Sequence, residues 1–183
     1  MMYLTEAINR RNSTREFSGR MIMPEVITKI VHNALNVYKL NEDFKCDIAI
    51  LTHDCKTKKY VADSLVKYGN SNKDQEAIDI GKCIDTASCL ILLYIDLEKS
   101  QDPDSDLITL GALGQNICLL AAEQYLGTLC TDKVIAIKHK IDNRLTKYED
   151  YDLCYGILLG YKDKVYSYKK DSIPTGICLD WRN

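Results

Sequence analysis

Residues 109–126 read TLGALGQNICLLAAEQYL. In a helix built from this stretch, apolar side chains cover almost the whole circumference. A helix that is apolar all round must be buried all round, and a small domain buries it most easily between its own sheet and a second subunit. We therefore expect a long buried helix at the interface of a homodimer. Gly127 follows directly and is expected to cap the carboxyl end of this helix.

Strand and helix patterns lie on both sides of this helix along the chain. Aliphatic or alternating runs predict strands over residues 46–52, 88–95 and 153–161. Apolar positions with a helical period predict helices over residues 4–12, 24–35, 56–68, 73–86 and 132–145. Thr5 and Asp132 are the expected caps of the first and last of these helices. The Gly-Asn-Ser-Asn sequence at 69–72 is expected to form a loop.

The composition indicates one domain. The chain has 183 residues, 46% of them hydrophobic and 27% charged, which suffices for one core but not for two. A formal net charge of -2 gives no general affinity for nucleic acid. We find neither a secretory signal nor a run long enough to span a membrane, so a cytoplasmic protein is expected. Its expected partners are small molecules and a second copy of itself.

The 8 cysteines include no Cys-x-x-Cys pair. Most of them sit among aliphatic residues, a distribution typical of buried, reduced thiols. The 3 histidines are scattered without metal-binding spacing, so no metal site is expected. A regulatory role for Cys130 stays open, although a buried inert thiol is the simpler interpretation.

The densest group of chemistry-bearing side chains is Arg-Asn-Ser-Thr-Arg-Glu-Phe at residues 11–17. Guanidinium groups donate charge-assisted, often bidentate bonds to phosphate, and a serine hydroxyl adds a neutral one. The composition therefore suits an anion site at the end of the first helix. A solvated helix end with snorkelling arginines accounts for the same composition, and on composition alone it is the simpler interpretation.

Residues 7–17, Ala-Ile-Asn-Arg-Arg-Asn-Ser-Thr-Arg-Glu-Phe, resemble the opening signature of the nitroreductase family, in which Ala-Ile and two further residues precede Arg-Arg-Ser-x-Arg-x-Phe. In that family these basic and hydroxyl groups hold the phosphate and ribityl chain of FMN. The resemblance assigns this role to Arg11, Asn12, Ser13 and Arg15. Asn12 replaces the second basic residue, so one charge partner of the phosphate is missing.

Two later blocks extend the resemblance. Residues 111–122 with 125–128 are similar to the family pattern Gly-x-x-x-Gln-Asn-x-x-Leu-x-Ala-Ala followed by Gly-Leu-Gly-Thr. The family places this helix in its dimer core and the following turn at the flavin ring, which implies flavin contacts by Leu126, Gly127 and Thr128. For Gly127 taken alone, a helix cap is an equally good explanation.

Residues 155–161 resemble the late family strand that ends in Gly-Tyr. The family places a phosphate-binding base after it, and Lys169 or Lys170 fills that place by resemblance; solubility charges are the alternative. The tail 162–183 is expected to dock on the partner subunit. The chain departs from the family at residues 36–44, where the usual Asn-x-Gln-Pro-Trp segment is absent and Asn41 approximates its asparagine only with a one-residue shift.

The resemblance implies an α+β fold with a central mixed, largely antiparallel sheet flanked by helices. It also implies an FMN-dependent oxidoreductase in which NADH or NADPH reduces the flavin, and a nitroaromatic, quinone or related acceptor then takes the electrons in a ping-pong hydride mechanism. The alternatives are a non-catalytic flavin-binding carrier or sensor, and a same-fold enzyme of dehalogenation or flavin breakdown. No side chain is expected to act as a catalytic nucleophile.

Overall fold

The computed structural model describes residues 3–36 and 46–163. Its centre is a 4-stranded sheet with the order β1-β2-β4-β3, in which all neighbouring strands are antiparallel. The strands are β1 (Cys46–Thr52), β2 (Cys89–Ile95), β3 (Gly127–Thr131) and β4 (Asp152–Gly160). The predicted α+β fold is confirmed, and three of the strands lie within one residue of their predicted ends.

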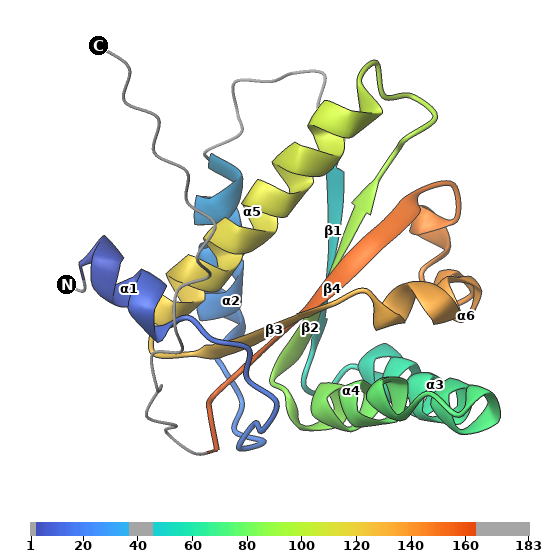
Figure 1. Ribbon diagram of the computed structural model, residues 1–183, viewed down its shortest axis with the longest axis horizontal. Coiled ribbons are helices and arrows are strands. Elements are labelled where there is room, and N and C mark those ends of the chain that lie inside the picture. Colours follow the sequence, from blue (N-terminus) through green and yellow to red (C-terminus); the bar gives the residue numbers. More distant parts are fainter. Residues whose placement is uncertain (1–2, 37–45, 164–183) are drawn as a thin grey trace, which may run out of the picture.

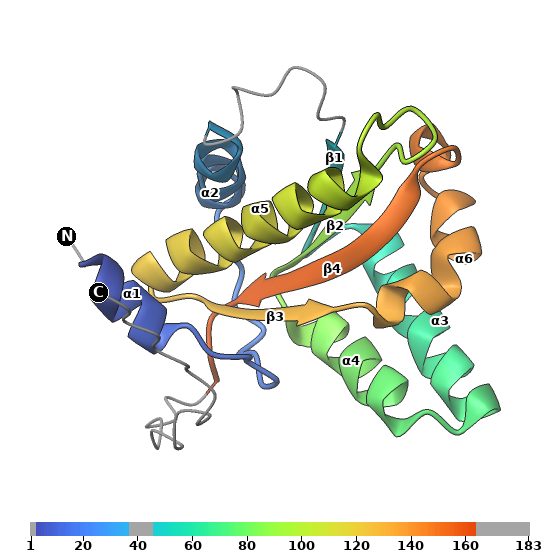
Figure 2. The same cartoon turned by 45° about the horizontal axis from the view of Figure 1, so that its top comes forward.

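Helices cover both faces of the sheet (Figures 1 and 2). One face carries α2 (Pro24–Asn36) and α5 (Pro103–Glu123), and α1 (Leu4–Arg10) packs beside α5. The opposite face carries α3 (Lys56–Asn72), α4 (Gln75–Thr86), η1 (Lys133–Ile137) and α6 (Lys138–Asp142), and η2 (Thr146–Tyr148) precedes β4. The result is a sheet between two helical layers.

Strand β2 shows why the core divides in two. Leu90, Leu92 and Tyr94 join the hydrophobic cluster under α3 and α4, whereas Ile91 and Leu93 join the cluster under α2 and α5. Successive side chains of a strand point to opposite faces, so a strand covered on both faces must be apolar at every position. All seven residues of β2 are buried, which explains its unbroken aliphatic sequence.

The long helix α5 starts earlier than predicted, because Asp102 caps it by accepting a hydrogen bond from the backbone of Ser105 and Pro103 opens the first turn. One face of α5 is buried against the sheet, but Leu107 and Ile108 are exposed. The sheet thus buries one side of this helix, and the expected burial of the other side by a second subunit stays a prediction. By length and hydropathy α5 would also pass for a membrane span, and the buried face accounts for that composition equally well.

Gly127 does not cap α5. The cap is Gln124, and Tyr125 then takes the left-handed conformation (φ 60) in which a glycine is more usual. Leu126 donates its backbone N–H to the Ala121 carbonyl, which turns the chain directly into β3. Gly127 is instead the first residue of β3, a strand that the sequence pattern missed.

Neither of the two predicted helix caps makes a capping side-chain bond, although Asp132 does occupy the cap position of η1. Thr5 lies inside α1, whose cap position is Tyr3 and has no capping side-chain bond. Asp132 makes no capping bond either, and the segment after it divides into η1 and α6. The short 3₁₀ and α-helical pieces follow the shape of the core, since Val134, Ile137 and Ile141 are still fully buried.

The break between α3 and α4 also lies later than predicted. Residues 69–72 form the last turn of α3, and the chain breaks at Lys73, which has a left-handed φ of 57. Asp74 then caps α4 by accepting from the Ala77 N–H. The helix carries a glycine at position 69 because the start of α4 packs closely against it. A Cβ there would lie 2.7 Å from the Asp74 carbonyl oxygen.

Candidate functional site

The segment that follows α1 lies against the start of β3 and the end of β4. Ser13 forms a parallel bridge with Thr128, and the Thr14 N–H donates to the Thr128 carbonyl at 2.8 Å. Phe17 forms an antiparallel bridge with Lys162, which follows β4. The sheet order therefore brings together two stretches that the sequence singled out separately, 11–15 and 126–128.

Lys162 places a cation at this junction that sequence analysis missed. Its Nζ donates to Asn12 Oδ1 at 3.0 Å and lies 3.4 Å from the Arg10 carbonyl oxygen. Within residues 3–36 and 46–163, no carboxylate pairs with it. Partial burial, together with the positive charges of Arg10 and Arg11, lowers the pKa of Lys162. An anion would relieve this unfavourable arrangement.

The three neighbouring arginines differ in how their charge is compensated. Arg10 pairs with Glu6 at 2.9 Å, and Arg15 lies 3.7 Å from Glu76 of α4. Arg11 has no ion pair with any carboxylate of the described residues. The uncompensated cations are thus Arg11 and Lys162, and we name the group of Arg11, Asn12, Ser13, Thr14 and Lys162 the anion cradle.

A buried hydroxyl in the anion cradle lacks a partner. The Oγ1 atom of Thr14 is buried and has no hydrogen-bond partner in the part of the chain that the structure describes. Leaving such a group unsatisfied costs about 1–3 kcal/mol, which a ligand atom could recover. Gly127 permits this packing, because a Cβ there would lie 2.6 Å from Thr14 Oγ1 and 2.9 Å from the Lys162 side chain.

A broad hollow of about 360 Å³ begins where β3 ends, between that strand and α5. It is lined by Gly111, Gly114, Gln115, Cys130, Thr131, Asp132 and Tyr155. The strand from Thr128 to Thr131 covers about 10 Å, so the anion cradle and the hollow lie at opposite ends of β3. Tyr155 donates its hydroxyl to the Leu110 carbonyl at 2.9 Å and fills the space over Gly114.

A model of the nitroreductase family matches residues 8–161. The chain belongs to the nitroreductase family. The match includes residues 11–14 of the anion cradle, the whole of α5 and all of β3. It ends one residue before Lys162. A search of curated proteins found no match.

Solved structures share the nitroreductase fold. A putative nitroreductase from Desulfovibrio desulfuricans in complex with FMN is 17% identical, with a TM-score of 0.77 over 98% of this chain and 98% of that chain. A nitroreductase with bound FMN from Desulfitobacterium hafniense is 18% identical, with a TM-score of 0.77 over 98% and 100%. The nitroreductase CinD from Lactococcus lactis in complex with chloramphenicol is 14% identical, with a TM-score of 0.78 over 98% and 100%. Family and fold support a flavin oxidoreductase.

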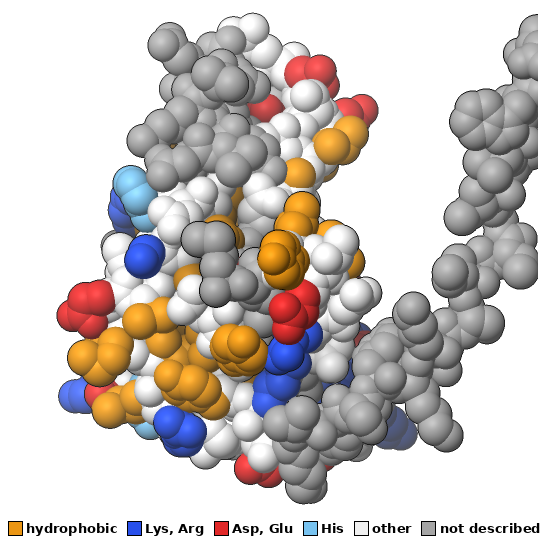
Figure 3. All heavy atoms as spheres, turned by 90° about the vertical axis from the view of Figure 1, so that its left-hand side faces the viewer, with side chains coloured by type: hydrophobic (Ala, Val, Ile, Leu, Met, Phe, Trp, Pro, Cys, Tyr) orange, Lys and Arg blue, Asp and Glu red, His pale blue; other side chains and the backbone are white. Residues whose placement is uncertain are grey.

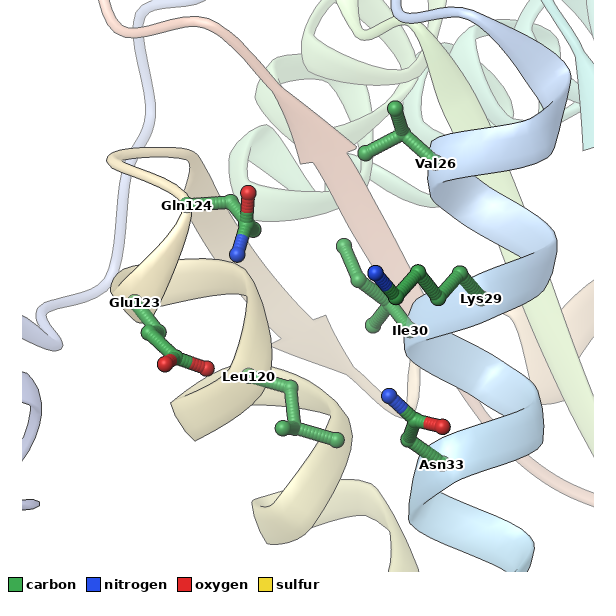
Figure 4. A pocket seen from close by; sticks show the side chains of 7 residues that line it. All are labelled: Val26, Lys29, Ile30, Asn33, Leu120, Glu123 and Gln124. Carbon is green, nitrogen blue, oxygen red and sulfur yellow. The ribbon is translucent and has the colours of Figure 1, made fainter. Parts of the chain in front are cut away.

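A second hollow of this nitroreductase-family chain, of about 130 Å³, lies between α2 and α5. Figure 4 shows side chains of the two helices lining it, among them Lys29 and Glu123, over an apolar floor that includes Ile30 and Leu120. One cation and one anion in the lining give no excess positive charge. The anion cradle, with two uncompensated cations, is the better site for a phosphate.

The structure places the predicted site residues in three groups. Arg11, Asn12, Ser13, Gly127 and Thr128 meet at the start of β3. The Leu126 side chain packs in the core cluster under α5, which leaves its backbone for any ligand contact, and Arg15 faces α4. Asn41, Lys169 and Lys170 lie outside the described residues, as does the tail beyond residue 163.

Sequence analysis missed Lys162 and Thr14. Lys162 directly follows Gly160 and Tyr161, so the first base after that dipeptide was a usable signal. Thr14 gave no such signal, since only its burial without a partner draws attention to it.

Proposed function

We propose that this chain is an FMN-dependent oxidoreductase that takes electrons from NADH or NADPH and passes them to a small organic acceptor such as a nitroaromatic or a quinone. The observation that carries the proposal is a pair of cations, Arg11 and Lys162, without a carboxylate partner among the described residues, beside a buried Thr14 hydroxyl that also lacks a partner there. FMN in two similar structures supports the cofactor. A similar structure from Parabacteroides distasonis, described as a putative NADH dehydrogenase/NAD(P)H nitroreductase, supports the reductant.

Each group of the anion cradle has a distinct role in this proposal. The Arg11 guanidinium and the Lys162 ammonium hold the FMN phosphate by charge-assisted bonds, and the Ser13 hydroxyl adds a neutral one. Lys162 supplies the charge that Asn12 lacks, and the Asn12 amide oxygen fixes the Lys162 ammonium in position. Bound flavin supplies the two-electron chemistry, and the hollow beside β3 receives reductant and acceptor in turn.

We further propose that the chain works as a homodimer through the outer face of α5. Ile108 is 75% exposed and Leu107 is 42% exposed on this face. A Cβ at Gly111 would meet no atom of the described residues within 4 Å, so a second backbone could approach α5 closely. Hydrophobic side chains also gather on the side of the molecule where α1 lies (Figure 3), and α1 exposes Leu4 and Ile8. An apolar surface of this kind favours self-association.

The flavin proposal is tested with the purified chain, FMN and an anaerobic cuvette. The expected result is that FMN binds, that NADH or NADPH bleaches the visible bands of the bound flavin, and that a quinone or nitroaromatic restores them. Binding without reduction would favour a carrier or sensor. Breakdown products of the flavin or loss of halide from a halogenated acceptor would favour the other same-fold chemistries, and absence of FMN binding would refute the proposal.

The dimer proposal is tested with two matched substitutions at exposed isoleucines. Ile108→Glu on α5 should convert the dimer to a monomer, because a charge is costly in an apolar interface. Ile135→Glu on η1, where the side chain is 43% exposed, is the control and should leave the mass in solution unchanged. Light scattering after size exclusion gives that mass. A dimer that survives Ile108→Glu would place the interface elsewhere.

A further inference from the structure

Two thiols on different elements lie in contact beside the hollow. The Sγ atoms of Cys118, on α5, and Cys130, on β3, are 3.6 Å apart. Cys118 is buried, whereas Cys130 is exposed and lines the hollow. The expectation that Cys130 is buried is therefore wrong. Both cysteines are free, and a disulfide bond of about 2.05 Å needs the two sulfurs to approach by only about 1.5 Å.

The surroundings of the pair favour one thiolate. Hydrogen bonds from Cys130 and Thr128, together with the positive charge of Arg11, lower the pKa of Cys118 to about 7 although the side chain is buried. The hydrogen bond with Cys118 raises the pKa of Cys130, and partial desolvation of its sulfur by the neighbouring atoms adds to this, although the residue as a whole is exposed. The pair therefore loses its first proton near neutral pH and retains the second. A thiolate is the nucleophile in thiol–disulfide exchange. Either sulfur can donate in the hydrogen bond between them, so the two thiols titrate as a pair and the charge can also reside on Cys130.

The other thiols of the described residues lack this arrangement. Burial raises the pKa of Cys89 to about 12 and that of Cys154 to about 11, and neither has a second sulfur in contact. Reactivity at neutral pH is thus expected at one pair of sulfurs and not at the cysteines in general.

We propose that Cys118 and Cys130 form a redox-active dithiol that small organic disulfides oxidise to an intramolecular disulfide. The exposed Cys130 sulfur attacks one sulfur of the reagent, whose S–S bond breaks and releases one small thiol. The Cys118 sulfur then attacks Cys130 in the mixed disulfide and releases the second small thiol. The two cysteines lose two electrons, the reagent gains them, and the two thiol protons leave with the two small thiols.

The product would join α5 to β3 at the wall of the hollow. Cys130 lies in the same short strand as Thr128, which contacts the anion cradle through Ser13 and Thr14. Oxidation would thus restrain the strand that lies between the cradle and the hollow. The proposal does not depend on FMN, since both sulfurs and their neighbours belong to this chain.

The sequence offers a direct assay. No lysine or arginine lies between residues 100 and 132, so trypsin releases both cysteines in one peptide, 100–133, which contains no other cysteine. The FMN-free protein is treated with oxidised glutathione at neutral pH, alkylated, digested and analysed by mass spectrometry. The expected peptide is two hydrogens lighter than the reduced form and carries neither alkyl group nor glutathione. The peptide with Cys154 should remain alkylated.

Two variants test the order of events. Cys118→Ser should trap glutathione on Cys130, because no second thiol can displace it. Cys130→Ser should leave Cys118 unmodified in the folded protein, because Cys118 is buried. A parent protein whose peptide stays fully alkylated, or carries glutathione as stably as Cys118→Ser does, would overturn the proposal. The parent measurement needs no variant, and either negative result leaves the flavin proposal untouched.

Discussion

Replacing Lys162 with methionine separates anion binding from folding. In the apo protein, two opposing effects act on this side chain. Its bond to Asn12 is favourable, whereas burial and the nearby Arg10 and Arg11 disfavour its charge. Methionine retains much of the apolar stem and removes both effects. We expect the free energy of unfolding to change by no more than about 1 kcal/mol.

The affinity for FMN should change much more than the free energy of unfolding. A hydrogen bond to a charged group contributes about 1.5–3 kcal/mol, and each 1.4 kcal/mol corresponds to a factor of ten, so Lys162→Met should raise the Kd for FMN about 10- to 150-fold. Quenching of flavin fluorescence gives the Kd, and competition by inorganic phosphate isolates the phosphate contribution from that of the ring. Denaturant titration gives the stability of the same samples.

Lys67→Met is the matched control, because Lys67 is exposed on α3, across the sheet from α2 and α5. Lys67→Met should alter neither the Kd for FMN nor the free energy of unfolding appreciably. If Lys162→Met binds FMN and phosphate as tightly as the parent protein, Lys162 is not part of the anion site and the assignment of the anion cradle is wrong.

Three further predictions concern the same site. Gly127→Ala should destabilise the fold by about 1–3 kcal/mol in denaturant titration, because the added Cβ would lie 2.6 Å from Thr14 Oγ1; unchanged stability would contradict this packing. Asn12→Arg should fail to tighten FMN binding, although it restores the family residue, because a guanidinium there displaces and repels the Lys162 ammonium; a gain in affinity would contradict this. Because the pKa of Lys162 is lowered, its ammonium group loses its proton at a lower pH than an ordinary lysine, whose pKa is 10.5. The phosphate affinity of the parent protein should therefore already fall as the pH rises toward 10.5, and that of Lys162→Met should not.

Much of the fold was predictable because burial imprints a local period on the sequence. β2 lies between two helical layers, so each of its residues is apolar and the strand stands out. The first half of the anion cradle was predictable for a different reason, since Arg11 and Ser13 lie in one short segment with a family signature. Both signals are contained within a few consecutive residues.

Strand β3 and the helix ends carried weaker signals. Gly127–Thr131 is only 5 residues long, and its glycine suggested a helix cap as readily as the start of a strand. The left-handed turn fell on Tyr125, a residue type that gives no warning of such a conformation. Local preferences there are close in energy, and packing of β3 against β4 decided between them.

The sequence by itself thus determined the layers of this protein, its family and the basic segment after the first helix, because each rests on neighbouring residues. Tertiary structure alone decided that Lys162 meets Asn12, 150 residues away, and that Cys118 of α5 meets Cys130 of β3. The first contact follows from the strand order β1-β2-β4-β3, which sets the end of β4 beside the start of β3, and from the bridge of Ser13 to Thr128. The second follows from the turn after α5, which leads the chain directly into β3. Local periodicity carries no information about which strands become neighbours, since pairing depends on the closure of the whole core.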